Sequence, residues 1–168
     1  ALKILADEYS HDESFRTRFQ RESRAAAALQ EPHVIPIHDW GEIDGHLYID
    51  MRLVQGKTLA ELLATGPLTP SRAANIVGQI GDALDGAHAE GLIHRDIKPS
   101  NILVAEYDEH PVPKVIDFGV AKATSQPLTE KTMFTGLGQI VGTLEYMSPE
   151  QAKVNQLDID TRSDIYSL

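Results

Sequence analysis

The sequence predicts an α+β fold, with a strand-rich first third and a helix-rich remainder. Short runs rich in β-branched and aromatic residues, bounded by Pro and Gly, occupy the first third. Further along, apolar residues recur at helical spacing, and the longest such run spans residues 69–87. With 168 residues, the chain is long enough to bury one ordinary core.

The first elements are a strand and a helix. Residues 2–5 alternate in the manner of a strand. Ser10 and Glu13 have the Ser-x-x-Glu form of a helix capping box, and residues 15–29 are rich in helix formers. We therefore expect one helix that starts near Ser10 and ends before Pro32.

A hairpin and three helices follow. Residues 35–40 and 47–51 are predicted to pair as strands, with a turn within residues 41–45. The pattern changes from strand to helix near residues 54–56, and leucines at helical spacing follow. Thr69 and Pro70 mark the start of the long helix, as its N-cap and its first residue. Polar residues up to about position 142 indicate a loop, and residues 163–168 begin another helix.

The composition excludes several classes of function. The chain has no Cys, which excludes disulfides and Cys-ligated metals. Its formal net charge of −10 argues against a surface dedicated to nucleic acid or to anionic membranes. There is no apolar run near the roughly 18–20 residues of a membrane span, so we expect no membrane contact within this segment.

Two short motifs carry the chemistry. Residues 94–101 read HRDIKPSN, and residues 117–119 read DFG. Asp96 and Asn101 are close enough for one tight loop to present both side chains, and two short strands with a turn could return Asp117 to the same place. Two carboxylates and an amide in one cleft are what phosphoryl transfer from Mg-ATP needs.

These motifs resemble those of the protein kinase family, specifically the eukaryotic-like Ser/Thr kinases of bacteria, and the resemblance covers essentially the whole chain. It implies a two-lobed, protein-kinase-like α+β fold, incomplete at both ends. Residues 1–54 would be a partial, β-rich N-lobe that lacks the Gly-rich loop, and residues 55–168 a partial helical C-lobe with a hinge near residues 52–56. We expect this fragment alone to be inactive and marginally stable, and its parent to be active.

The resemblance assigns roles in catalysis. Asp96 would orient the substrate hydroxyl and accept its proton, and Lys98 would steady the γ-phosphate of ATP. Asn101 and Asp117 would bind Mg²⁺, for which Mn²⁺ is an alternative. Lys3 would hold the ATP phosphates and pair with a helix Glu, for which Glu22 has the best spacing. Three other glutamates lie near in sequence: Glu8, Glu13 and Glu31.

The resemblance also implies an adenine pocket and a regulated loop. Arg95 would grip a phosphorylated residue of an activation loop that spans residues 117–150, and Asp164 would hold the catalytic-loop backbone. Met51 would stand beside adenine, the hinge backbone from Arg52 to Val54 would bond it, and Leu103 and Ala1 would form floor and roof; each apolar member is equally suited to core packing. The candidate regulatory residues are Thr129, Thr132, Thr135 and Thr143, of which Thr135 is favoured as phosphosite and Thr143 is expected to shape the substrate site.

The expected function is transfer of the γ-phosphoryl group of Mg-ATP to Ser or Thr of protein substrates, including the chain's own activation loop, for which a homodimer is one arrangement. The main alternative is a pseudokinase or ATP-binding scaffold, and others are a small-molecule phosphotransferase and a purely structural domain. A cytoplasmic location follows from the resemblance, with a parent that carries any membrane anchor outside this segment.

Overall fold

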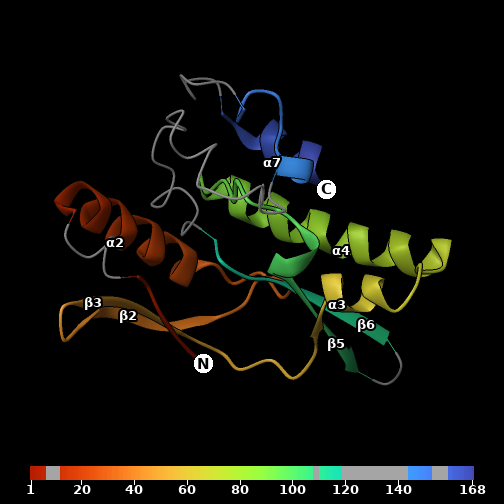
Figure 1. Ribbon diagram of the computed structural model, residues 1–168, viewed down its shortest axis with the longest axis horizontal. Coiled ribbons are helices and arrows are strands. Elements are labelled where there is room, and N and C mark those ends of the chain that lie inside the picture. The colour runs from red at the N-terminus through yellow and green to blue at the C-terminus, as the bar shows by residue number, and fades with distance from the viewer. Residues whose placement is uncertain (7–11, 108–109, 119–143, 153–158) are drawn as a thin grey trace, which may run out of the picture.

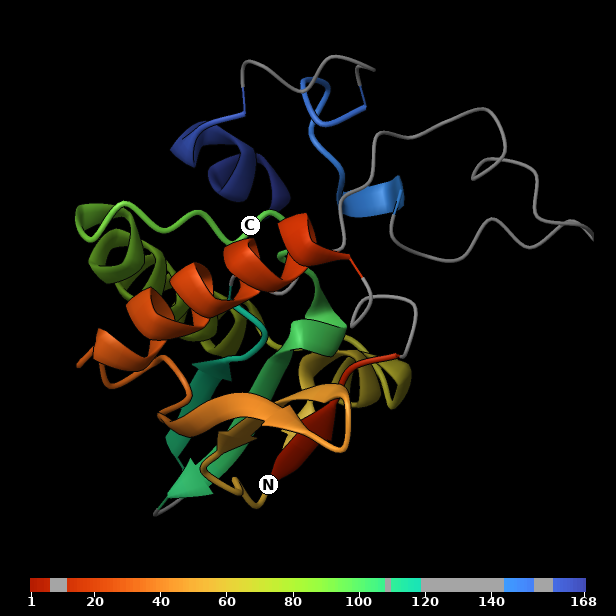
Figure 2. The ribbon, with the colours of Figure 1, turned by 90° about the vertical axis from the view of Figure 1, so that its left-hand side faces the viewer.

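The computed structural model describes residues 1–6, 12–107, 110–118, 144–152 and 159–168. The first part of the chain is a three-stranded antiparallel sheet covered on one face by a helix (Figure 1 and Figure 2). Strands β1 (Leu2–Ile4), β2 (Ile37–Ile43) and β3 (His46–Met51) pair in the order β1-β3-β2, and the helix is α2 (Glu13–Ala28). The predicted strands and helix are therefore confirmed in type and order.

The start of α2 differs from the prediction. The N-cap is Asp12, whose carboxylate accepts hydrogen bonds from the backbone N–H groups of Ser14 and Phe15 at 2.8 and 3.2 Å. The side-chain hydroxyl of Ser14 also donates to it, and these bonds lower the pKa of Asp12 below its ordinary value. The capping box predicted for Ser10 and Glu13 is wrong, because the helix begins only at Glu13; Ser10 itself lies outside the described residues.

The hairpin turn is tighter than the sequence suggested. Strand β2 runs through Gly41 to Ile43, so the turn consists of Asp44 and Gly45 alone. Both residues have positive φ, 50° and 81°, as a two-residue hairpin turn of the primed type requires. The turn fixes the register in which Trp40 lies opposite Ile49.

The second part of the chain is mainly helical. Helices α3 (Leu59–Ala64), α4 (Pro70–Ala89) and α7 (Thr161–Ser167) are present as predicted, and Thr69 caps α4 with Pro70 at its first position. The 3-10 helix η1 (Pro99–Asn101) leads into β5 (Ile102–Tyr107), which pairs with β6 (His110–Val115) and with the short β4 (Lys57–Thr58). A further 3-10 turn, η2 (Leu144–Tyr146), precedes the last segment.

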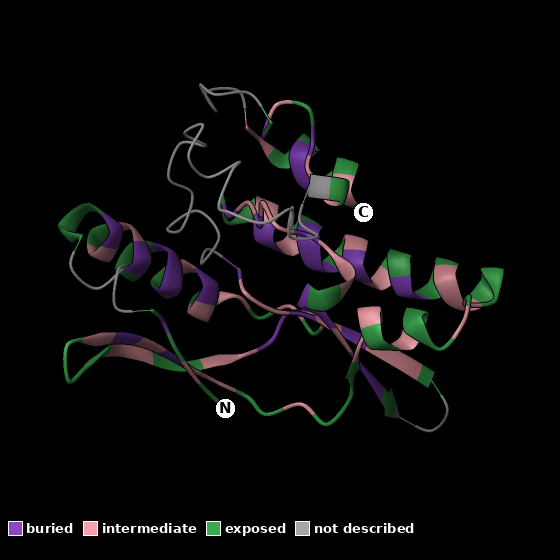
Figure 3. Ribbon diagram, in the orientation of Figure 1, coloured by how far each residue is buried: buried purple, intermediate pink, exposed green. Residues whose placement is uncertain are grey.

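Two apolar cores hold these parts together (Figure 3). The smaller lies between α2 and the first sheet and includes Phe15, Phe19 and Leu47. The larger lies among α4, β5 and β6 and also takes in Ala26 of α2 and Val34. Backbone hydrogen bonds of 3.0 and 2.7 Å between residues 33–35 and Val115 join the two parts beside the second core. In the described ranges, no helix is both long and apolar enough to cross a membrane.

Candidate active site

The loop that carries Asp96 is anchored by a buried histidine. His94 is fully buried and packs edge-on against Phe118, with ring centroids 4.7 Å apart. Its Nε2 lies 2.8 Å from the carbonyl oxygen of Ile116, and its Nδ1 lies 3.2 Å from the backbone nitrogen of Asp96. A carbonyl only accepts, so Nε2 carries the proton and Nδ1 accepts from Asp96. Burial lowers the pKa of His94, which keeps the ring neutral.

Asp164 fixes the backbone of the same loop from α7. Its carboxylate accepts from the backbone N–H of His94 at 2.8 Å and from that of Arg95 at 2.7 Å. The Nε2 of His88, near the end of α4, donates to it at 2.8 Å. Asp164 has a relative exposure of 1 %. Its buried carboxylate accepts from two N–H groups of the catalytic loop and from the His88 ring. The expectation that Asp164 hydrogen-bonds the loop backbone is confirmed.

Two polar side chains contact the carboxylate of Asp96. Its Oδ2 forms an ion pair with the Nζ of Lys98 at 2.7 Å and accepts from the Nδ2 of Asn101 at 2.9 Å. Asn101 also donates to the backbone carbonyl of Asp96 at 2.8 Å. These contacts hold the carboxylate in one orientation while it stays partly exposed, which suits a group that must reach a substrate hydroxyl.

Asp117 stands opposite this group, after β6. The backbone N–H of Ile116 donates to the carbonyl of Asn101 at 3.0 Å, so the two motifs lie against each other. Asp117 has a positive φ of 68°, and Arg95 one of 69°, unusual values for residues other than Gly. Such backbone strain gathers at functional sites, where the surrounding contacts hold it in place.

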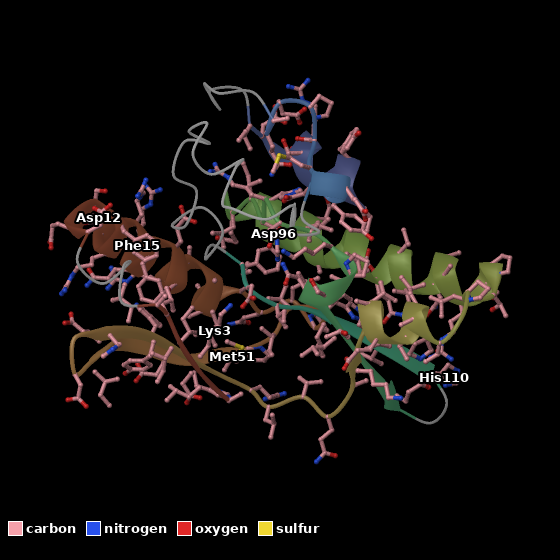
Figure 4. All side chains as sticks on the ribbon, viewed as in Figure 1. Lys3, Asp12, Phe15, Met51, Asp96 and His110 are labelled. Atoms are coloured by element: carbon pink, nitrogen blue, oxygen red, sulfur yellow. The ribbon has the colours of Figure 1, made fainter. Side chains whose placement is uncertain are left out.

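Lys3 reaches this site from the first sheet. Its Nζ lies 2.7 Å from the Oδ2 of Asp117. Figure 4 shows Lys3 close to Met51, from the paired strands β1 and β3, with Asp96 on the neighbouring part of the chain. The Lys3–Asp117 ion pair thus joins the first sheet to the segment after β6, and the Ile116–Asn101 hydrogen bond places that segment against the loop that carries Asp96.

Glu22 occupies a different place from the one expected. Among the described residues, no ion pair joins Lys3 to Glu22; the Glu22 carboxylate instead contacts the guanidinium of Arg21 at 3.4 Å. Glu22 is buried and lines a cavity with Arg21 and Arg95, between α2 and the loop after α4. Burial lowers the pKa of Arg95, and the negative charge of Glu22 acts in the opposite direction.

The residues predicted to contact adenine lie immediately before β1, on β3 and the segment after it, and on β5. The backbone N–H of Met51 donates to the carbonyl of Ala1 at 2.8 Å, and that of Arg52 donates to Pro36 at 2.9 Å. Within the described chain, no backbone–backbone hydrogen bond uses the Arg52 carbonyl or the Val54 N–H, so these two groups can bind a flat, polar ring edge. An apolar cavity behind Met51 is lined by Ala26, Val34, Ile35, Ile37, Ile49, Met51, Asp117 and Phe118. Leu103 lies in β5, opposite Thr58.

The oxygen atoms at this site suit Mg²⁺ that is bound together with phosphates and water, rather than a metal ion coordinated by protein groups alone. The Nδ2 of Asn101 donates to Asp96, so its Oδ1 is available as a hard oxygen ligand, and the Asn101 backbone is bonded to Ile116, the residue before Asp117. No group of three His, Cys, Asp or Glu suited to a metal occurs in the described residues. Mg²⁺ is commonly held by one or two protein oxygens together with phosphates and water, and Asn101 with Asp117 could bind it in that way.

Some predicted residues lie outside the described part of the chain, and some residues at the site were not predicted. Thr129, Thr132, Thr135 and Thr143 lie outside the described residues. Two polar residues beside the site were not predicted, the half-buried His88 and the buried Gln151. The sequence did hold a signal for Gln151, because Ser148 and Gln151 have the Ser-x-x-Gln spacing of a capping box.

Comparison with known proteins identifies the family of this chain. The family model of the protein kinase domain matches residues 1–168. The Ser/Thr-protein kinase PknE of Mycobacterium bovis is 54% identical over 169 residues, which are 100% of this chain and 28% of PknE. PknD of Mycobacterium tuberculosis is 47% identical over 100% of this chain and 24% of its own. The chain thus spans about a quarter of the length of these relatives.

The fold agrees as well. The crystal structure of the Mycobacterium tuberculosis PknI kinase domain superimposes with a TM-score of 0.76 at 32% identity, over 99% of this chain and 58% of that one. The sheet-plus-helix first part and the helical second part are therefore the two lobes expected from the sequence. This chain belongs to the protein kinase family, among the serine/threonine kinases of bacteria.

Proposed function

We propose that the protein transfers the γ-phosphoryl group of Mg-ATP to Ser and Thr hydroxyls of protein substrates. The observation that carries this proposal is the Asp96 cluster. A carboxylate bonded to Lys98 and Asn101 stands on a loop that contacts of Asp164 and His94 hold in place, and Asp117, which pairs with Lys3, follows the Ile116 N–H that donates to Asn101. A carboxylate suited to be a general base, two ammonium groups and two oxygen ligands for a metal are the groups that phosphoryl transfer needs.

Each residue has one task in this mechanism. The Asp96 carboxylate accepts a hydrogen bond from the substrate hydroxyl, directs its oxygen to the phosphorus and takes up its proton. Lys98, already 2.7 Å from Asp96, places its positive charge beside the transferred group. Asn101 and Asp117 hold Mg²⁺, which when bound neutralises charge on the phosphate oxygens. The Arg52 carbonyl and the Val54 N–H bind the adenine edge, and Met51, Leu103 and Ala1 enclose it.

Lys3 changes partner in this proposal. In the structure its ammonium neutralises Asp117 at 2.7 Å. When Asp117 serves as metal ligand, Lys3 is released to bind the nucleotide phosphates, and Glu22 is the carboxylate proposed to hold it there. Glu22 would then exchange its contact with Arg21 for one with Lys3.

Regulation and setting are proposed as well. Arg95 would bind a phosphorylated threonine, with Thr135 favoured over Thr129 and Thr132, and Thr143 would contribute to the substrate site. A homodimer would serve autophosphorylation in trans. We place the segment in the cytoplasm, where ATP and protein substrates are present, and we set the lobe boundary at residues 54–55, after the hinge.

The test is a kinase assay on the full-length protein. The protein is incubated with labelled ATP, Mg²⁺ and a generic basic protein, beside Asp96→Asn and the matched control Asp44→Asn at the exposed hairpin turn. We expect label on Ser or Thr in wild type and control, and a loss of at least about 100-fold in Asp96→Asn. ATP binding without label in any protein would favour a pseudokinase scaffold, and label on small molecules alone would favour a small-molecule phosphotransferase.

A further inference from the structure

The backbone of Arg95, the residue before Asp96, is strained, and hydrogen bonds hold both its N–H and its carbonyl. Arg95 has a φ of 69°, in the left-handed region that a long side chain seldom adopts. Its backbone N–H donates to Oδ1 of Asp164 at 2.7 Å. Its carbonyl accepts from Nε2 of Gln151 at 2.6 Å. A backbone in this conformation persists only where such contacts over-determine it.

Gln151 makes this contact from a closed turn. Its Oε1 accepts from the backbone N–H of Ser148 at 3.0 Å, while its own N–H points to the Oγ of Ser148 at 3.4 Å. These reciprocal bonds are those of a capping box, in which Glu and Gln serve equally well. Only Gln carries an N–H group that can also donate to the Arg95 carbonyl, so the residue type exceeds what the turn itself needs.

The turn that contains Gln151 is also attached to α7, the helix whose Asp164 accepts from the Arg95 N–H. The Oγ of Ser163 donates to Oε1 of Glu150 at 2.6 Å. Ser163 and Asp164 are neighbours in α7, and both are buried. One helix therefore fixes the Arg95 peptide on both sides: directly through Asp164, and through Glu150 and Gln151 on the carbonyl side.

We propose that Gln151 is a positioning residue that sets the orientation of Asp96 through the Arg95 carbonyl. It has a relative exposure of 8 %, so the lost hydrogen bond would not be replaced freely by water. The inference rests on the proposed kinase function for its catalytic readout, and on geometry alone for its structural one. It makes the segment after the activation loop a direct part of the catalytic geometry.

The test compares Gln151→Glu with wild type in the full-length protein. Glu keeps the acceptor for Ser148, so the turn is retained. It replaces the donor for Arg95 by a carboxylate oxygen that repels the Arg95 carbonyl, so the bridge is lost. We expect kcat to fall about tenfold with the KM for ATP changed less than about twofold. The matched control is Gln79→Glu in α4, whose Nε2 donates to the Pro111 carbonyl at 3.1 Å away from the site.

A second variant and a second measurement keep the outcome decisive. Gln151→Met removes both side-chain bonds at similar volume, and we expect the same fall in kcat. Amide hydrogen exchange over residues 93–97 should quicken by about tenfold in both variants and stay unchanged in Gln79→Glu. Wild-type kcat and unchanged exchange in Gln151→Glu would overturn the proposal, as would a parallel loss of ATP affinity and thermal stability, which indicates general unfolding. A wild type without transfer would refute the kinase function, and the exchange data would still decide the role of Gln151.

Discussion

The neutral, buried imidazole of His94 makes the stability of the protein sensitive to mild acid. Its two ring nitrogens bond the backbone of Ile116 and of Asp96. Desolvation by burial lowers the pKa of His94 more than the nearby carboxylates of Asp164, Asp96 and Asp117 raise it. The ordinary pKa of 6.5 applies in the unfolded chain, whereas burial lowers the pKa of His94 in the fold. Below about pH 6.5 the unfolded state therefore binds a proton that the native state rejects.

We expect the free energy of unfolding to fall as the pH drops below about 6.5, by at most about 1.4 kcal/mol per pH unit from this group. Urea unfolding at pH 7.5 and 5.5 measures the loss, and His94→Phe, which keeps a ring against Phe118, should show a smaller one. Carboxylates contribute to the pH-dependent loss of unfolding free energy in both wild type and His94→Phe. The difference between the two losses therefore gives the contribution of His94. Equal losses in the two proteins would contradict this assignment.

Asp164 allows a graded test of the loop anchor. Asp164→Asn has one acceptor oxygen for three donors and leaves buried N–H groups unpaired, so we expect a loss of about 2–4 kcal/mol in unfolding free energy. His88→Ala removes one of the three bonds and should cost about 1 kcal/mol. Urea titration gives both values, and a larger loss in His88→Ala than in Asp164→Asn would show that the loop is anchored otherwise.

At the scale of single residues, the sequence identifies the residues of the site better than it identifies their contacts. Asp96, Asn101 and Asp117 were placed together by motif spacing, and Lys98 was assigned by resemblance. In the structure Asp96 contacts Lys98 and Asn101, while Asp117 contacts Lys3. The partner of Lys3 was not predictable in the same way. Whether its ammonium meets Glu22 or Asp117 depends on where α2 sits relative to the sheet, a tertiary property that spacing along the chain does not encode.

A glycine in helix α4 has space for a side chain, whereas a glycine beside strand β4 does not. In the middle of α4, a Cβ added at Gly78 would meet no atom within 4 Å. At Gly56, beside β4, an added Cβ would lie 2.5 Å from the backbone carbonyl oxygen of Val104. The first glycine only loosens a helix, whereas the second permits two backbones to approach each other.

We expect Gly78→Ala to raise the free energy of unfolding by about 0.5–1 kcal/mol, because Ala has the higher helix propensity. Gly56→Ala should lower it by about 1–3 kcal/mol, since the clash involves backbone that cannot rotate away. Thermal unfolding of the two variants beside wild type measures both changes. A stabilised Gly56→Ala would mean that this close approach is not maintained in solution.

The elements themselves were largely predictable, and their ends were not. Apolar periodicity identified α4 with its cap at Thr69, because one cap and one long apolar face coincide there. At α2 two cap residues compete, Ser10 and Asp12, and both satisfy a local pattern. The two-residue strand β4 was not predicted, because its pairing with β5 is decided by tertiary contact and not by periodicity.

At the scale of the whole molecule, the ion pair of Lys3 and Asp117 connects the first sheet with the loop after β6. Ligands that engage both groups link the two lobes and should stabilise the entire fold. At a concentration of 100 times Kd, Mg-ATP is expected to add about 2.7 kcal/mol to the free energy of unfolding.

Thermal unfolding should therefore show a rise in Tm with Mg-ATP, and a smaller rise with ATP in excess EDTA. Asp117→Asn loses the carboxylate for the metal and should abolish the difference between these two conditions. The hairpin variant Asp44→Asn is a control with the same change of charge and should behave as wild type. An equal Mg²⁺ effect in Asp117→Asn would remove Asp117 from the metal site.

The left-handed backbone at Arg95 has a consequence for the evolution of this protein. A non-glycine residue in that conformation costs about 1 kcal/mol or more, a sizeable part of the small margin by which a domain stays folded. A library selected for heat resistance alone should therefore enrich Gly or Asn at position 95, whereas selection for activity should keep Arg. The two selections would draw this position in opposite directions, so its occupant in any laboratory-evolved descendant reports which pressure dominated.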